Sequence, residues 1–310
     1  MPVIFECEYR GGRYAGLGLP TPGELLRLHP VADGELRKAV VTGVGAGEVL
    51  AVLAEHPATV AVAAHDPNVR FLPPLLPEGG VGSLVTGFMS THRSKHEQEP
   101  YPPVEFRPPN WLIKAMGSWL RMPGEPLAVS GSTVALLEEP EVALVYVNDE
   151  AGEPRYAGYT FANDLNDIGF HLQNPWGWTP YSKLCDTSMT PWLFLDEPPA
   201  VAAGRIVIER AGETAWQGPF ACGADALYQP VPDMVDHLFS HPGLRRPNLV
   251  NYLLLGSDKA SYHAGFRIAD GDRVTIEVAS HGVVLSNPIA WDRRPNPRIE
   301  AGRAAQPAAV

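Results

Sequence analysis

Turn-forming residues are the feature that most constrains how this chain can fold. The 310 residues include 30 glycines and 32 prolines. Proline fixes one backbone angle and lacks an N–H donor, and glycine readily adopts left-handed conformations, so both interrupt regular structure. A chain with so many turn formers is expected to fold into short strands joined by irregular loops, rather than into long helices.

Short apolar runs between these turn formers predict the strands of the second part of the chain. The runs are at residues 128–129, 142–147, 155–162, 204–208, 250–255 and 274–278. Turn sequences such as Asp-Gly-Asp at 270–272 separate them. Many short strands with few helices predict a curled, mixed β-sheet domain.

The first part of the chain has its own pattern. Residues 25–28 and 49–53 predict short helices, and residues 1–7 and 60–64 predict strands. The glycine-rich segment 43–47 is interpreted as a simple turn, because the acidic residue that a dinucleotide site needs after a second strand is not convincingly placed.

A proline-rich segment at residues 100–109 marks a boundary between two domains. The sequence therefore predicts a smaller N-terminal domain at 1–104, a second domain at 105–295 and a disordered tail at 296–310.

Charge and composition exclude several classes of protein. The net charge of -11 argues against nucleic acid or an anionic membrane as the main partner. No run of about twenty apolar residues exists to span a bilayer, and the first residues lack the basic flank and long apolar core of a signal peptide. Three widely spaced cysteines fit reduced thiols. We therefore expect a cytoplasmic protein whose hydrophobic content of 45% is enough for a large core.

Three carboxylates carry most of the chemical information. Glu139 and Glu141 are two residues apart, so an extended strand would point both side chains to one face. Asp164 closes the apolar run 159–162, where a strand would end. Converging carboxylates repel one another unless a cation or a proton neutralises them. Oxygen ligands suit Mg²⁺, Mn²⁺ or Ca²⁺ better than zinc, so the spacing predicts a divalent-metal site, with Lys183 on a polar turn nearby.

The order of these motifs resembles the fumarylacetoacetate hydrolase superfamily. The matching segments are Glu-x-Glu at 139–141, GYTFAND at 158–164, Lys183, Gly-Ser at 256–257 and Asp-Gly-Asp at 270–272. The resemblance covers roughly residues 110–289. It implies an α+β, mostly β fold, in which a mixed β-roll catalytic domain follows a smaller N-terminal domain, and it implies a homodimer. In the superfamily the residues that match Glu139, Glu141 and Asp164 hold Mg²⁺, which chelates a 2-oxo acid that the matching Lys183 helps to orient.

Several segments are similar to one branch of that superfamily, the 2-keto-3-deoxyarabonate dehydratases. They are residues 109–118, 123–127, 138–141, 182–184 and 205–223. The branch usually carries Lys-Gly-Asp-Gly-Ser at residues 114–118 (here KAMGS), Asn-Glu at 163–164 (here Asn-Asp) and Gly-Glu at 223–224 (here Gly-Ala). Lost polar groups at a substrate pocket imply a changed substrate. The candidate substrate-binding residues are Lys114, Ser118, Tyr159, Ser182 and Ser257.

The general base is sought on a candidate lid at residues 87–100, within the N-terminal domain. Hydrolases of the superfamily activate water with a histidine and a glutamate at His-x-x-Glu spacing on a mobile lid. The third residue after His92 is Lys95, which cannot accept a hydrogen bond from the imidazole, whereas Glu99 follows His96 at that spacing. Almost no apolar residue pins this segment, so we expect it to be mobile until a metal-bound keto acid orders it. The candidate catalytic residues are His92, His96, Glu99 and Lys183.

Five other histidines are interpreted as structural or surface residues. They are His171, His237, His241, His263 and His281.

A metal-bound 2-oxo acid is expected to react through an enolate at C3. The branch resemblance favours a lyase that dehydrates a 2-keto-3-deoxy acid. Asp164, which is common among the C–C hydrolases, and the His96/Glu99 pair instead favour hydrolysis of an acylpyruvate or fumarylacetoacetate-like β-diketo acid. Decarboxylation is a further outcome of the same enolate. Lys95 and the lost acidic residues motivate another alternative, a non-catalytic keto-acid binder.

Overall fold

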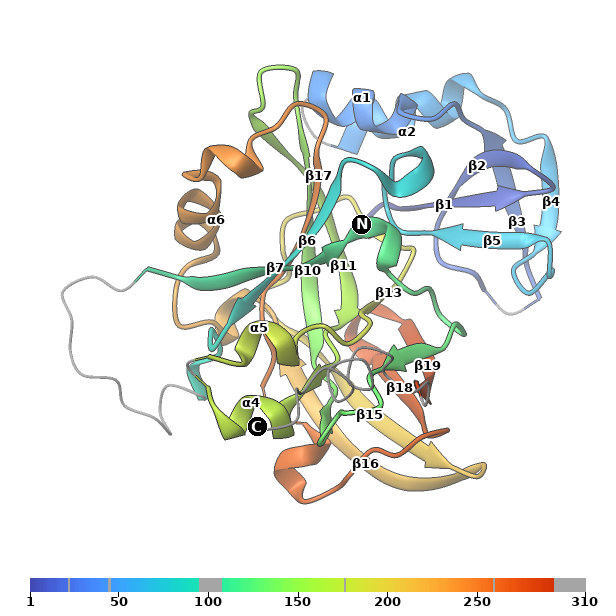
Figure 1. The fold of residues 1–310 in the computed structure, drawn as a ribbon. Coiled ribbons are helices and arrows are strands. Elements are labelled where there is room, and N and C mark those ends of the chain that lie inside the picture. Colours follow the sequence, from blue (N-terminus) through green and yellow to red (C-terminus); the bar gives the residue numbers. More distant parts are fainter. Residues whose placement is uncertain (22, 44–45, 95–107, 176, 259, 293–310) are drawn as a thin grey trace, which may run out of the picture.

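The computed structural model describes residues 1–21, 23–43, 46–94, 108–175, 177–258 and 260–292 of the chain. Two sheets dominate this part of the molecule, and short helices lie at their edges and faces (Figure 1). The fold is α+β and mostly β, as the abundance of turn formers predicted.

The larger sheet has twelve strands and runs through the molecule. Its strands are β1 (Val3–Tyr9), β2 (Gly12–Leu17), β3 (Leu25–Pro30), β4 (Val60–Ala63), β5 (Val69–Leu72), β6 (Ser83–Met89), β7 (Asn110–Met116), β10 (Pro140–Asn148), β11 (Pro154–Asn163), β13 (Ser188–Met189), β14 (Leu193–Phe194) and β17 (Val250–Leu254). The order is β4-β3-β2-β1-β14-β11-β10-β17-β6-β7, with β5 beside β1 and β13 beside β11. Strand β17 pairs antiparallel with β10 and parallel with β6.

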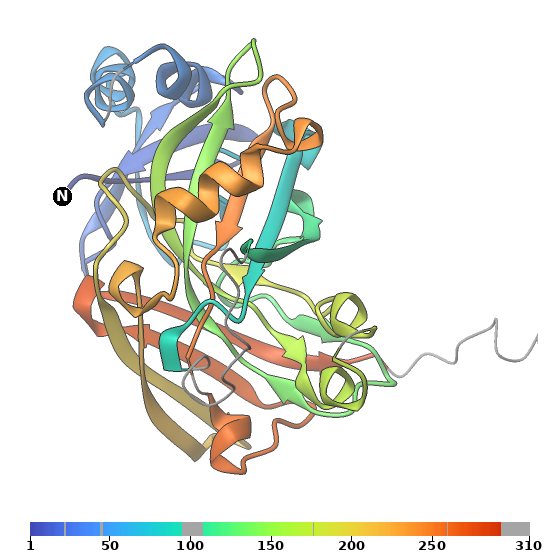
Figure 2. The same cartoon turned by 90° about the vertical axis from the view of Figure 1, so that its left-hand side faces the viewer.

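A second sheet of five strands lies at the opposite end of the molecule from helices α1 (Glu35–Thr42) and α2 (Ala46–Glu55) (Figures 1 and 2). Its strands, in spatial order, are β16 (Glu213–Cys222), β15 (Ala202–Arg210), β18 (Arg273–Val278), β19 (Val283–Trp291) and β8 (Leu127–Val129). The main hydrophobic core joins the two sheets, because it contains Leu144 and Phe161 from the large sheet and Ile206, Ile276 and Leu285 from the smaller one. A two-stranded sheet of β9 (Leu136–Leu137) and β12 (Asn166–Asp167) completes the β structure.

The remaining helices are short. They are α4 (Ile168–Gln173), α5 (Thr179–Ser182), α6 (Val231–Phe239), and the 3-10 turns η1 (Glu78–Gly80), η2 (Gly117–Trp119), η3 (Ala224–Ala226), η4 (Pro242–Leu244), η5 (Ser261–Ala264) and η6 (Ala279–His281). Helix α6 lies across strands of the large sheet (Figure 2), where the Phe239 ring is 5.3 Å from that of Tyr146. Within the described part of the chain, no helix has the length and apolar character needed to cross a membrane.

All the predicted strands are present, but one predicted helix is wrong. Residues 25–28 form the start of β3, where Leu26 and Leu28 are buried and Leu25 and Arg27 are exposed. This alternation has the period of a strand, and β3 pairs with both β2 and β4. The predicted helix at 49–53 lies inside α2, whereas α1 and α6 were not predicted. The segment 43–47 joins α1 to α2 rather than a strand to a helix, and residues 44–45 lie outside the described residues.

The two predicted domains share one sheet. Strand β1 pairs with β14, and β6 lies between β17 and β7, so residues 83–89 belong to the sheet of the second domain. The proposed boundary at residue 104 and the tail at 296–310 lie outside the described residues, and both stay predictions.

Candidate metal centre

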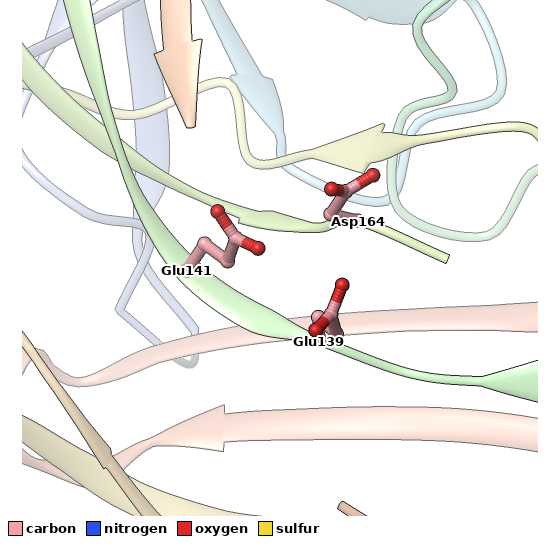
Figure 3. A group of neighbouring side chains, drawn as sticks. All are labelled: Glu139, Glu141 and Asp164. Carbon is pink, nitrogen blue, oxygen red and sulfur yellow. The ribbon is translucent and has the colours of Figure 1, made fainter. Parts of the chain in front are cut away.

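The three predicted carboxylates meet at the end of the β10–β11 hairpin. Glu139 directly precedes β10, Glu141 is the second residue of that strand, and Asp164 directly follows β11. The Asp164 backbone N–H donates to the Glu139 carbonyl oxygen over 2.9 Å, which fixes the two strand ends side by side. The three side chains point to a common centre (Figure 3), and one oxygen of each lies within 4.8 Å of the others. The predicted convergence is therefore confirmed, whereas the role of these residues as metal ligands stays a proposal.

Two buried lysines flank the carboxylates. Lys183, at the C-terminal end of α5, donates from Nζ to Glu139 Oε2 over 2.5 Å and to Asp164 Oδ2 over 2.6 Å. Lys114 of β7 forms an ion pair with Asp164 Oδ1, and its Nζ donates to the Leu165 carbonyl oxygen over 2.7 Å. None of the three carboxylates and two lysines is more than 9% exposed. Three ionised carboxylates and two ammonium groups leave one net negative charge, which buried surroundings strongly disfavour.

The ionisation of this cluster reflects that imbalance. Burial raises the pKa of Glu141 well above its ordinary value, and the charges of Asp164 and Glu139 raise it further. Burial alone would lower the pKa of Lys183, but the neighbouring charges of Asp164, Glu139 and Glu141 outweigh it and raise that pKa above its usual range. The lysine is therefore charged, and the three carboxylates and two lysines together carry one net negative charge.

Backbone and amide donors hold two of the carboxylates in place. The Gly256 N–H donates to Glu141 Oε2 over 2.6 Å, and Asn166 Nδ2 donates to Glu139 Oε2 over 2.8 Å. Gly256 has φ of 101°, and a Cβ at this position would lie 2.0 Å from the Thr91 hydroxyl oxygen. Only glycine fits here, because the conformation is left-handed and the neighbouring hydroxyl leaves no room.

Glu138 joins the cluster to η5. Its side chain is fully buried. It accepts hydrogen bonds from the Ser261 N–H over 2.8 Å and from the Ser261 hydroxyl over 2.7 Å. Burial raises the pKa of Glu138 to about 7, against the lowering effect of these bonds. The residue next to the Glu139 carboxylate thus anchors the segment that carries Tyr262 and His263.

A cavity of about 320 Å³ opens onto Glu139, Glu141 and Lys183. This volume is at the lower end of the range for small-molecule sites, so it suits one small acid. One wall is helix α4, which presents Ile168, His171 and Leu172.

Helix α5 and η5 form further parts of the cavity wall. Thr179, Ser182 and Lys183 come from α5 and its C-terminal end, and Tyr262 and His263 come from η5. The cavity is therefore acidic and cationic around the carboxylates, and mixed apolar and polar elsewhere.

The structure brings three of the five predicted substrate-binding residues to this region. Ser182 lines the cavity, Lys114 contacts Asp164, and buried Ser257 follows Gly256. Neither Lys114 nor Ser257 is part of the cavity lining.

The other two predicted substrate-binding residues lie elsewhere. Tyr159 is in the hydrophobic core, where its ring stacks on Phe194 at 5.1 Å and its hydroxyl donates to Met1 Sδ over 3.1 Å. Tyr159 and Asp164 are five residues apart along β11 and its end, so their side chains point to opposite faces. Ser118 is exposed on η2, where it neighbours Gly80. The structure therefore places neither side chain at the cavity.

The described part of the candidate lid is held against the molecule. Residues 87–89 are the end of strand β6. The Thr91 hydroxyl donates to the Leu255 carbonyl oxygen over 2.6 Å, and the Tyr228 N–H donates to the Thr91 carbonyl oxygen over 2.7 Å. Arg93 Nε donates to the Leu227 carbonyl oxygen over 2.7 Å. The predicted mobility of residues 89–100 stays a prediction, and residues 95–100 of this segment lie outside the described residues.

The candidate bases of the lid are not part of the described cavity lining. His92 is buried, with Nδ1 2.9 Å from the Ser94 hydroxyl oxygen and 3.7 Å from Asp258 Oδ1. The Ser94 hydroxyl donates to Asp258 Oδ1, so Ser94 links the His92 and Asp258 side chains. His96 and Glu99 lie outside the described residues, so their pairing stays a prediction.

The sequence interpretation missed several cavity residues. They are Asn166, His171, Tyr262 and His263. Asn166 follows Asp164 by two residues, and this i, i+2 spacing could have indicated that both side chains lie at the same site. His171 follows Ile168 by three residues and precedes Leu172, which is the spacing of one helix face. Nothing in the sequence around Tyr262 and His263 indicated their position, because η5 reaches the cavity through the buried Glu138–Ser261 contact.

No protein-family model matches the chain, and no curated protein matches its sequence. Solved structures do match. The apo form of 2-keto-3-deoxy-D-arabinonate dehydratase is 17% identical, with a TM-score of 0.65, over 94% of this chain and 100% of that one. The same enzyme complexed with magnesium and 2,5-dioxopentanoate matches at 16% identity, with the same TM-score and coverage.

A second kind of enzyme has a similar structure. The 5-carboxymethyl-2-hydroxymuconate delta-isomerase from Mycobacterium smegmatis is 17% identical, with a TM-score of 0.60, over 94% of this chain and 100% of that one. Matches over nearly the whole chain, together with the β10–β11 hairpin that carries the carboxylates, confirm the architecture that the sequence motifs implied. The chain has the fold of the fumarylacetoacetate hydrolase superfamily.

Proposed function

We propose that this protein is a Mg²⁺-dependent enzyme that acts on a 2-oxo acid through its enolate, and that it is a lyase that dehydrates a 2-keto-3-deoxy acid. The observation that carries the proposal is the buried group of Glu139, Glu141 and Asp164 at the base of a small cavity, flanked by two lysines. Such a group is costly to bury unless it binds a cation.

The donor set fits Mg²⁺. Carboxylate oxygens are the hard ligands that this ion prefers, with the remaining positions open to water or substrate oxygens. Mn²⁺ or Ca²⁺ would use the same oxygens. A divalent ion would change the net charge of the cluster from one negative to one positive, which matches the single negative charge of a monocarboxylic 2-oxo acid. When bound, the ion would polarise the keto group and stabilise negative charge on its oxygen.

The lysines perform separate tasks in this proposal. Lys183 lines the cavity and contacts Glu139 and Asp164, so its ammonium group orients the substrate carboxylate and keto oxygen. Lys114 is not part of the described cavity lining, and its ion pair with Asp164 holds that carboxylate in position.

Dehydration is favoured by the sequence segments similar to those of the dehydratase branch. It is also supported by the likeness to a dehydratase structure that contains magnesium and 2,5-dioxopentanoate. Hydrolysis of a C–C bond in an acylpyruvate or fumarylacetoacetate-like acid is the second candidate, and Asp164 favours it because the hydrolases commonly have aspartate at the matching position. We further infer a cytoplasmic homodimer, which sedimentation of the purified protein and fractionation of cells would test.

The test starts from enzyme stripped with EDTA. Activity should be absent and should return with Mg²⁺ or Mn²⁺. A 2-keto-3-deoxy sugar acid should lose water and give a dicarbonyl acid, whereas an acylpyruvate should remain intact. Cleavage of the acylpyruvate into two acids would select the hydrolase alternative. Tight calorimetric binding of both acids without turnover would select the binder alternative, and activity that persists without metal would refute the metal centre.

A further inference from the structure

We propose that His171 is the base that removes the C3 proton of the bound acid, and that Thr179 positions it. The inference rests on the proposed function, because it assigns the proton acceptor for the enolate of that same site. It differs from the expectation drawn from the sequence, in which the base lay on the lid and His171 was a structural residue.

His171 lies on helix α4, which hydrogen bonds fix to neighbouring segments of the chain. The Asp167 side chain caps α4 by accepting from the Phe170 N–H over 2.9 Å, and it also accepts from the Val134 N–H over 2.9 Å and the Ala135 N–H over 3.1 Å. Strand β12, which precedes the helix, pairs with β9. The helix is therefore fixed to the same chain segment that carries Asp164.

His171 lines the substrate cavity. Ile168 and Leu172, which lie one helical turn apart on the same helix, line it as well. Glu139 and Lys183 border the same cavity. A volume of about 320 Å³ holds one small acid, so a ligand held by the carboxylate cluster also lies against His171.

The hydrogen bonds around Thr179 assign the tautomer of the imidazole. The Thr179 hydroxyl donates its one proton to the Pro175 carbonyl oxygen over 2.6 Å. Its oxygen is 2.8 Å from His171 Nδ1, so it accepts a hydrogen bond from Nδ1–H. The neutral ring therefore has its basic lone pair on Nε2.

The second histidine of the described cavity lining has the opposite tautomer. His263 Nδ1 accepts from the Ala260 N–H over 3.2 Å, so the Nε2 atom of its neutral ring carries the proton and can only donate. His92 does not line the cavity. In the described part of the lining, His171 is thus the histidine whose hydrogen bonds prepare it to accept a proton.

The proton that leaves C3 of the acid is transferred to His171 and is later returned to the leaving group. The C3–H bond of the acid breaks, its proton goes to His171 Nε2, and its electron pair forms a C2–C3 double bond while the keto oxygen takes the negative charge. In a 2-keto-3-deoxy acid this electron pair then expels the C4 hydroxyl group. That group leaves as water after taking a proton from the His171 imidazolium, so the histidine returns to its starting state.

The test measures enolate formation without any later step. Pyruvate has exchangeable C3 protons and no leaving group, so proton NMR in D₂O with Mg²⁺ reports proton removal alone. We expect the wild-type protein to exchange these protons. His171→Asn and His171→Gln should slow exchange by about 10²–10⁴-fold, the usual contribution of a general base, while calorimetry still shows Mg²⁺ and pyruvate bound.

Thr179 provides the matched pair of positioning variants. Thr179→Ser keeps the hydroxyl and should retain most of the exchange rate, whereas Thr179→Val keeps the shape and should slow exchange without loss of pyruvate binding. His65→Asn, at an exposed histidine, controls for the histidine substitution itself. A thermal melt of each variant shows whether a slower exchange rate comes from loss of the base or from unfolding of the protein.

The outcomes are distinct. Exchange in both His171 variants at the wild-type rate would refute the assignment of His171 and leave the proposed function standing. Equal rates in Thr179→Val and Thr179→Ser would refute the positioning role. Wild-type protein that binds no pyruvate with Mg²⁺, or binds it without exchange, would refute the enolate chemistry of the proposed function and the inference with it.

Discussion

Two groups of charged side chains in the described part of the molecule differ in burial and in how their charges balance. The N-terminal ion network consists of Glu6, Arg13, Asp33 and Arg37. It is only partly buried, because Glu6 is buried whereas the Asp33 side chain is 33% exposed. Arg13 Nη2 donates to Glu6 Oε1 over 2.8 Å and Nη1 donates to Asp33 Oδ1 over 3.0 Å, while Arg37 Nη2 donates to Asp33 Oδ2 over 2.8 Å. Two carboxylates meet two guanidinium groups, so the network is neutral without any ligand.

The N-terminal ion network also satisfies the backbone around it. Glu6 Oε2 accepts from the Leu75 N–H over 2.8 Å, and Arg13 Nη2 donates to the Leu76 carbonyl oxygen over 2.6 Å. It thereby ties β1 and β2 to the proline-rich segment that leads into β6.

The carboxylate cluster of Glu139, Glu141 and Asp164 lacks such balance. Together with its two lysines, the cluster carries one net negative charge, and burial and the charges of Asp164 and Glu139 raise the pKa of Glu141. Balanced buried charges serve structure, whereas an unbalanced group stores repulsion that a ligand can relieve. The carboxylate cluster thus differs from the N-terminal ion network in net charge as well as in burial, and both differences make it the candidate ligand site.

The largest expected effect is on activity, at the carboxylate cluster. Glu141→Gln keeps the size and the acceptor for the Gly256 N–H but removes one negative charge. We expect turnover to fall by about a thousandfold or more, since several kcal/mol of transition-state stabilisation by the metal is lost. In EDTA the free energy of unfolding should stay equal or rise, because repulsion is relieved. Steady-state kinetics and urea unfolding measure both quantities, and a large loss of metal-free stability would show that the Glu141 charge stabilises the fold.

The second effect is on stability, at the N-terminal ion network. Glu6→Ala leaves Arg13 and the Leu75 N–H without their buried partner, so unfolding should become easier by about 3–5 kcal/mol. Mg²⁺ affinity should stay unchanged. The control is Glu8→Ala on the same strand, where the partner Arg70 is exposed, and the expected cost is below about 1 kcal/mol. Equal losses in the free energy of unfolding of the two variants, measured in urea, would show that the N-terminal ion network does not stabilise the fold.

The smallest expected effect is the pH dependence of the stability that Asp33 contributes. Burial alone would raise the pKa of Asp33, but the hydrogen bond from Arg37 and the charges of Arg37 and Arg13 outweigh it and lower that pKa. A lowered folded-state pKa means that Asp33 stabilises the fold above its unfolded-state pKa, and that this contribution is lost as the pH falls through the folded-state value. Asp33→Asn should therefore be less stable than wild type at pH 6, by up to about 1 kcal/mol. The difference should shrink below about pH 4, as thermal melts over this pH range would reveal, and a constant difference would contradict the role of the carboxylate charge.

Local pattern explains which parts of the site could be predicted. The i, i+2 spacing of Glu139 and Glu141 determines their common face once the segment is extended, and the end of the apolar run places Asp164 beside them. The same logic should have excluded Tyr159, which is an odd number of residues from Asp164 on one strand. Residues 25–28 were misassigned because four residues sample only one turn of a helix, and the pairing of β3 with β2 and β4 decided the outcome.

The remaining parts depend on contacts between distant segments. His263 reaches the cavity because Glu138 is buried against Ser261, and Gly256 meets Glu141 because β17 pairs with β10. The N-terminal ion network likewise joins residues 6 and 75. No period along the sequence encodes these contacts, since they follow from the way the sheets assemble.

The parallel pairing of β17 with β6 has a consequence for how the protein is made. Residues 250–254 fit between residues 83–87 and 143–147, and only then does Gly256 reach Glu141. Pairings between segments so distant in sequence raise the contact order and slow folding. During synthesis the three carboxylates leave the ribosome well before β17 does. The complete carboxylate site, including the Gly256 N–H that donates to Glu141, can therefore form only late, after the ribosome has passed residue 256.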